Sequence, residues 1–136
     1  MSRPISHHVI DHISLNVADY ERAKAFYAAA LAPLGFSLVM EVTVEMTGSF
    51  AGAGFGVDGK PFFWLTGTGR QTPIQHIAFG AESRALVDAY YEAALAAGGT
   101  DNGAPGLRPH YHPNYYGAFV LDPEGHNIEA VCHAPQ

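Results

Sequence analysis

Two histidines and one glutamate have the types and positions that could hold a metal ion. His12 and His76 occupy the same place in two similar segments of the chain, each on the more polar face of a predicted strand. Glu129 lies in a third, otherwise apolar strand, where an unpaired carboxylate is costly. Two imidazoles and one carboxylate from three strands could form a facial site that binds a divalent cation and leaves positions open for a ligand. The alternative is three unrelated polar residues on partly solvated strands.

A loop near the C-terminus is the second segment that could carry chemistry. Two histidines in it could act as general acids or bases, and its tyrosines could donate to a developing oxyanion. The alternative is a solvent loop whose prolines and tyrosines pack on a sheet edge. A rival metal site would combine His110, His112 and His126. The candidate residues of the loop are Arg108, His110, Tyr111, His112, Tyr115 and Tyr116.

An aromatic run at residues 62–64 has two interpretations. Phe62 and Trp64 could fill a hydrophobic core, which is the usual role of such a run. They could also form an apolar wall for a bound ligand. The single cysteine, Cys132, excludes an intrachain disulfide and is typical of an inert buried thiol.

The chain contains an internal repeat at an offset of 64 residues. The segment Ile10–Leu15 returns as Ile74–Phe79, and the match continues without a gap through the helix that follows. In that helix Phe26 matches Tyr90, and Tyr27 matches Tyr91. Two copies of one unit predict a pseudo-symmetric body, so His12 and His76 become a candidate pair.

The two copies predict the same order of elements, which is one strand, one helix and three strands. Alternation, helical stripes, caps and turn residues define the segments. The first copy predicts strands at 9–17, 36–44, 50–57 and 62–66, with a helix from Asp19 to the Pro33–Gly35 stop. The second predicts strands at 74–80, 115–121 and 126–132, a helix from Ser83 to Gly98, and a loop at 98–114 containing a strand that the pattern does not place. We therefore expect a single domain, 1–136, with modules at 8–66 and 74–133 and a linker at 67–73.

Size and charge limit the partners. The chain has 136 residues, 48% of them hydrophobic, and a formal net charge of −6. Only seven residues are Lys or Arg, so nucleic acid and anionic membrane surfaces are poor partners. No segment approaches the ~20 apolar residues of a membrane span, and the first residues lack the apolar core of a signal peptide. We expect a cytoplasmic protein.

Three stretches resemble the vicinal oxygen chelate superfamily, which includes glyoxalase I, bleomycin-resistance proteins, fosfomycin-resistance enzymes and extradiol dioxygenases. They are Asp11–Asp19, the helix with Phe26 and Tyr27 that ends at Pro33–Phe36, and Asp122–Glu129. The resemblance extends from about residue 8 to 133. It implies an α+β fold in which two βαβββ modules form a curled, cup-shaped mixed sheet around a metal, and it suggests a homodimer.

The resemblance also implies a ligand set. His12, His76 and Glu129 match three of the four family positions. The fourth, where glyoxalase I carries a ligand that doubles as the catalytic base, falls within the apolar segment 62–65. The remaining set is closer to the His-His-Glu ligands of dioxygenases and fosfomycin-resistance enzymes. Arg108 is the one cationic residue in a plausible loop for gripping a phosphonate, which argues against fosfomycin modification. Extradiol dioxygenases with this ligand set are commonly longer.

The sequence thus predicts an enzyme that uses one divalent metal, either Fe, Mn, Zn or Ni. Its substrate is a small molecule with vicinal oxygens, and its chemistry is dioxygenase-like or lyase/isomerase-like. The competing prediction is a metal-free protein that binds and sequesters a small molecule, as bleomycin-resistance proteins do. Candidate substrate-binding residues are Phe62, Trp64, Arg108 and Tyr116.

Overall fold

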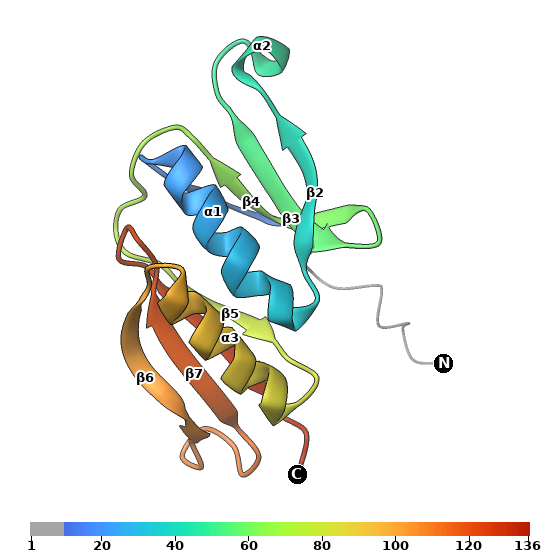
Figure 1. Cartoon of the computed structure of the whole chain (residues 1–136), viewed down its shortest axis with the longest axis vertical. Coiled ribbons are helices and arrows are strands. Elements are labelled where there is room, and N and C mark those ends of the chain that lie inside the picture. The colour runs from blue at the N-terminus through green and yellow to red at the C-terminus, as the bar shows by residue number, and fades with distance from the viewer. Residues whose placement is uncertain (1–9) are drawn as a thin grey trace.

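The computed structural model describes residues 10–136, which form two similar halves around a shared hydrophobic core (Figure 1). Each half has a four-stranded mixed sheet with a helix packed on one face. The two helices, α1 and α3, also contact each other. The predicted α+β fold of two βαβββ modules is confirmed. The expected starts of the first module at residue 8 and of its first strand at residue 9 lie outside the described residues.

The first module has the strand order β1-β4-β3-β2. Strand β1 is parallel to β4, and the other neighbours are antiparallel. Figure 1 shows β2, α2 and β3 extending as an arm at one end of the molecule. The elements are β1 (Ile13–Asn16), α1 (Tyr20–Leu31), the 3₁₀ turn η1 (Ala32–Leu34), β2 (Ser37–Val42), α2 (Val44–Thr47), β3 (Gly52–Val57) and β4 (Lys60–Thr66).

The second module repeats this topology with the order β5-β8-β7-β6. Strand β5 is parallel to β8, as β1 is to β4. The internal repeat in the sequence therefore corresponds to two copies of one structural unit. The elements are β5 (His76–Gly80), α3 (Arg84–Ala96), β6 (Thr100–Leu107), β7 (Tyr116–Leu121) and β8 (Asn127–Cys132).

The predicted helix caps and apolar stripes are present. The Asp19 side chain accepts a hydrogen bond from the Arg22 backbone N–H, and Ser83 does the same for Leu86. No helix in the described part of the chain is both long and apolar enough to cross a membrane. The stripe residues that are fully buried are Ala23, Phe26, Tyr27, Ala30, Leu31, Val87, Tyr90 and Ala94.

Two elements differ from the sequence prediction. The strand expected at 36–44 ends at Val42, because Thr43 caps the short helix α2 and Gly48 ends it with a φ of +83°. The loop expected at 98–114 contains strand β6 over Thr100–Leu107. Two irregularities in the pairing of β6 with β7 break its alternation, which hides the strand in the sequence.

The turn before β8 joins the two modules. The Tyr27 hydroxyl donates a 2.5 Å hydrogen bond to the buried Asp122 carboxylate. The Glu124 carboxylate accepts hydrogen bonds from the backbone N–H groups of Ala18 and Asp19, immediately before α1. Residues from the second module therefore stabilise the start of the first module's helix.

Candidate metal centre

Glu129 and His76 face each other across the parallel pair β5 and β8. His76 pairs with Asn127 and Ala78 pairs with Glu129, so the alternation of both strands puts His76 and Glu129 on one face. His76 Nε2 lies 2.7 Å from Glu129 Oε1. The Glu129 residue is 0% exposed, whereas the His76 side chain is 54% exposed. A buried carboxylate thus meets an imidazole that solvent can reach.

Tyr115 completes this cluster from the segment before β7. Its hydroxyl donates a hydrogen bond to Glu129 Oε2. Burial, and then the hydrogen bond to Glu129, raises the pKa of Tyr115 to about 12, so the phenol keeps its proton at neutral pH. Gly117 lies beneath both groups, since a Cβ atom there would be 3.2 Å from Glu129 Oε2 and from the Tyr115 ring.

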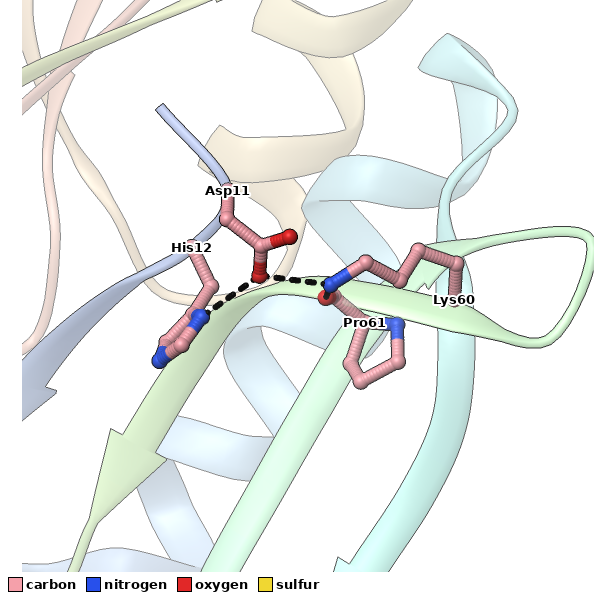
Figure 2. Close-up of polar contacts among 4 residues, drawn as sticks. All are labelled: Asp11, His12, Lys60 and Pro61. Atoms are coloured by element: carbon pink, nitrogen blue, oxygen red, sulfur yellow. Dashed lines mark hydrogen bonds and ion pairs between the residues drawn. The ribbon is translucent and has the colours of Figure 1, made fainter. Parts of the chain in front are cut away.

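His12 lies immediately before β1 and is held by Asp11. Figure 2 shows the Asp11 carboxylate between the His12 ring and the Lys60 ammonium group. Asp11 Oδ1 lies 2.7 Å from His12 Nδ1 and 2.7 Å from Lys60 Nζ. Lys60 first, and then His12, lowers the pKa of the Asp11 carboxyl group.

This arrangement determines which nitrogen of His12 is free. An ionised carboxylate only accepts hydrogen bonds, so His12 Nδ1 must carry the proton that it donates to Asp11. In the neutral ring the lone pair is then on Nε2, the nitrogen available to a metal or a substrate proton. A carboxylate that orients an imidazole in this way is a common feature of metal-binding histidines.

The structure brings together two of the three predicted ligands. Within residues 10–136, no group of three or more His, Cys, Asp or Glu side chains is close enough to hold a metal ion. His76 and Glu129 lie together, and His12 lies apart from them. A single chain therefore has two candidate ligands, His76 and Glu129, together on the second module. The third candidate, His12, lies on the first module, where Asp11 holds its ring.

His12 lines a cavity of about 490 Å³ on the first module together with Trp64. Ser14 and Thr66 lie on the same face of β1 and β4, and Phe50 closes the cavity from the arm. Trp64 is half-buried there. Its role as an aromatic wall for a ligand stays a prediction.

Phe62 lies on the other side of the sheet. In the pairing of β3 with β4, Phe55 faces Phe63 but Gly56 faces Pro61, so Phe62 is the extra residue of a β-bulge. The bulge removes Phe62 from the alternation that would have placed it beside Trp64. Its ring packs edge-on against Phe36 at 4.9 Å, and it lines a separate apolar cavity of about 870 Å³.

The loop residues lie in three different places. The guanidinium of Arg108 lies over the Phe119 ring, which is itself 6.2 Å from the His76 ring. Tyr116 points the other way, since its hydroxyl donates to Asp88 on α3. The remaining candidates form a chain of ring contacts that reaches Tyr115. The His110 ring packs at a tilt against Tyr111, and Tyr111 packs edge-on against Tyr115. The His112 ring lies near His133, which also packs on Tyr115.

The rival site of three histidines is not assembled in the described part of the chain. His126 is fully buried, and its Nδ1 accepts a hydrogen bond from the Gln75 backbone N–H. His110 and His112 lie in the exposed loop. Burial of His126 in the core therefore separates it from the other two.

Sequence reasoning missed Asp11 and Lys60. Lys60 follows the tight turn between β3 and β4. The register that pairs Ile13 with Phe63 brings the beginning of β4 next to the residues before β1. Pairing of β1 with β4 places Asp11 near Lys60. Finding this contact therefore required the register of that strand pair in addition to the order of the elements.

Comparison with known proteins agrees with the fold. Residues 9–130 match the model of the Glyoxalase/Bleomycin resistance protein/Dioxygenase superfamily. This match covers most of the sequence, and the chain belongs to that superfamily. No curated protein matches the sequence significantly.

Solved structures of three proteins illustrate the similarity. A glyoxalase/bleomycin resistance protein from Albidiferax ferrireducens T118 is 27% identical, with a TM-score of 0.72 over 94% of this chain and 100% of that one. Glyoxalase I from Zea mays is 24% identical, with a TM-score of 0.69 over 90% of this chain but 45% of the maize protein. A glyoxylase/bleomycin resistance protein/dioxygenase domain from Frankia sp. EAN1pec is 17% identical, with a TM-score of 0.68 over 92% of this chain and 97% of the Frankia chain.

Proposed function

We propose that this protein is a divalent-metal-dependent enzyme acting on a small substrate with vicinal oxygens, and that His12, His76 and Glu129 are its metal ligands. The observation that carries the proposal is the fully buried Glu129 carboxylate, whose Oε1 lies 2.7 Å from His76 Nε2. A buried carboxylate is costly unless a positive charge or a metal compensates it. Imidazole nitrogen and carboxylate oxygen suit Fe, Mn, Zn or Ni.

A bound metal would supply Lewis acidity toward the substrate oxygens. The protonated Tyr115 hydroxyl orients Glu129 and can donate a hydrogen bond to an oxyanion if the substrate draws it away. Arg108 adds a positive charge over the Phe119 ring, which itself lies near the His76 ring. The proposed proton donors and acceptors of the adjoining loop are His110, Tyr111 and His112.

The same proposal includes a homodimer in which His12 comes from a second copy. Two observations support it. His12 lies outside the His76–Glu129 cluster of its own chain. Among the strands of residues 10–136, β1 and β5 are both edge strands, so within these residues each sheet has an edge beside its histidine that a second copy could approach.

Mixing His12→Ala and His76→Ala subunits tests this assembly. After random exchange, a site shared between two copies regains roughly a quarter of the wild-type metal, because half of the dimers carry one intact site out of two. A site within one chain regains none.

The activity itself is tested by turnover with and without metal. Oxygen uptake with catechol would identify dioxygenase chemistry, and turnover of the hemithioacetal of methylglyoxal and glutathione would identify lyase chemistry. Either activity should disappear with EDTA and return with one of the four metals. Turnover that persists in EDTA would contradict metal dependence.

A metal-free binding protein is the second candidate. The cavity beside Trp64 and the net charge of −6 favour a flat or cationic ligand. This candidate is supported if ligand binding is unchanged by EDTA and no substrate is turned over.

A further inference from the structure

Trp64 occupies, in the first module, the position that Glu129 occupies in the second. Glu129 pairs with Ala78 of the parallel strand β5. The residue 64 positions before Ala78 is Ser14, and Ser14 pairs with Trp64 of β4 in the same parallel register. The internal symmetry therefore places an indole ring where the second module has its carboxylate.

The indole lies across two glycines of the neighbouring strand. Gly54 pairs with Trp64, and a Cβ atom at Gly54 would lie 2.9 Å from Trp64 Cζ2. A Cβ atom at Gly52 would lie 3.6 Å from Trp64 Cε3. At Gly54, only glycine allows the ring to come this close to β3, whereas the distance at Gly52 is an ordinary van der Waals contact. The strand backbone thus supports one side of the indole.

The rest of the indole contributes to the cavity that His12 lines. Val42, Phe50 and Pro61 provide further apolar wall, whereas His12 and Lys60 provide polar groups. A cavity of about 490 Å³ is large enough for a ligand with one ring. Its lining suits a molecule that is apolar and flat on one side and carries polar atoms on the other.

We propose that Trp64 is a stacking platform that makes the site selective for substrates whose vicinal oxygens are attached to a flat aromatic ring. This inference rests on the proposed function, because it assumes that the oxygens are bound by a metal at His12. Aromatic rings prefer offset or edge-on contact, and such pairs add to affinity beyond the area that they bury. Trp64 then determines specificity at a position where a carboxylate would have been a fourth ligand.

Two probes with the same pair of vicinal oxygens test the proposal. Catechol has an aromatic ring, whereas cis-cyclohexane-1,2-diol has a puckered saturated ring. Trp64 is the single tryptophan of the chain, so quenching of its fluorescence reports contact with the probe. Each probe is titrated, in the absence of oxygen, into Zn²⁺-loaded protein. Calorimetry gives the Kd values of wild type and of the variants that lack the indole and therefore its fluorescence.

We expect catechol to quench Trp64 and to bind about tenfold more weakly to Trp64→Leu, with most of the affinity restored in Trp64→Phe. The Kd of cis-cyclohexane-1,2-diol should be the same in all three proteins. Failure of catechol to bind the Zn²⁺-loaded protein, or equal loss of both probes in Trp64→Leu, would overturn the proposal.

Zn²⁺ affinity, measured first, distinguishes failure of this proposal from failure of the proposed function on which it rests. Wild type and Trp64→Leu should bind Zn²⁺ equally, because the indole is not a ligand. If the wild-type protein binds no Zn²⁺ or other divalent metal, the proposed function fails and the inference fails with it. If Zn²⁺ binds but the two probes are not distinguished, only the inference about Trp64 fails.

Discussion

Replacing Glu124 with alanine should destabilise the protein by removing a contact between its two modules. The Glu124 carboxylate accepts from the Ala18 N–H at 2.9 Å and from the Asp19 N–H at 2.8 Å, and the residue is 8% exposed. A hydrogen bond to a charged group contributes roughly 1.5–3 kcal/mol. Ala18 and Asp19 are exposed, so water can replace part of this loss.

We therefore expect Glu124→Ala to lower the free energy of unfolding by about 2–3 kcal/mol, and Glu124→Gln by about half as much because one oxygen acceptor remains. The melting temperature should fall by about 10 °C for the alanine variant. Urea unfolding followed by circular dichroism gives the free energies. Hydrogen exchange should show loss of protection at the amides of Ala18 and Asp19.

Glu92→Ala is the matched control, because Glu92 is exposed on α3 and its carboxylate forms no hydrogen bond or ion pair with the first module within residues 10–136. Its free energy of unfolding should stay within about 0.5 kcal/mol of wild type. The reasoning is refuted if Glu124→Ala is as stable as this control, or if the two amides keep their protection.

Two further predictions concern the two faces of the candidate site. In Glu129→Gln the pKa of Tyr115 should fall below its value of about 12, because phenolate no longer forms beside a carboxylate; burial, the larger cause, keeps it above 10. An NMR titration of labelled tyrosine measures this, and an unchanged pKa would contradict the contact with Glu129. Gly54→Ala should cost about 1–3 kcal/mol and shift the Trp64 emission, because the new Cβ meets the indole at 2.9 Å. Gly80→Ala, with no atom within 4 Å of its Cβ, should leave both unchanged.

The order of the elements along the chain was predictable because it depends on local patterns. Alternation put Leu15 and Val17 in the core, and the helical stripe put Phe26 and Tyr27 there. Each of these residues is buried by the face of its own element, which sequence periodicity reports directly. The repeat then extended these predictions to β5, α3, β7 and β8 of the second module.

The environment of Phe62 was not predictable, because it depends on one extra residue in a strand pair. Strict alternation would place Phe62 beside Trp64, but the bulge moves it to the other side of the sheet. Strand β6 was not placed by the sequence for the same reason, since irregular pairing around Gly103 and Gly106 interrupts its alternation of side chains. Bulges are defined by the partner strand, which a single-sequence pattern does not contain.

The candidate ligands were predictable one by one, but their assembly was not. The parallel pairing of β5 with β8 explains why Glu129 contacts His76. Nothing local to His12 indicates that Asp11 and Lys60 hold its ring, because Lys60 arrives from the beginning of β4. In the proposed dimer, the position of His12 relative to His76 and Glu129 depends on how two copies of the chain associate, which sequence periodicity does not encode.

The metal content of the purified protein tests the central claim most directly. Protein purified without chelator should contain about one divalent ion per chain by elemental analysis. His76→Ala should contain almost none, whereas His110→Ala, which alters an exposed loop histidine, should keep the wild-type content. Equal metal contents in wild type and His76→Ala, whether near zero or near one, would contradict a site at His12, His76 and Glu129.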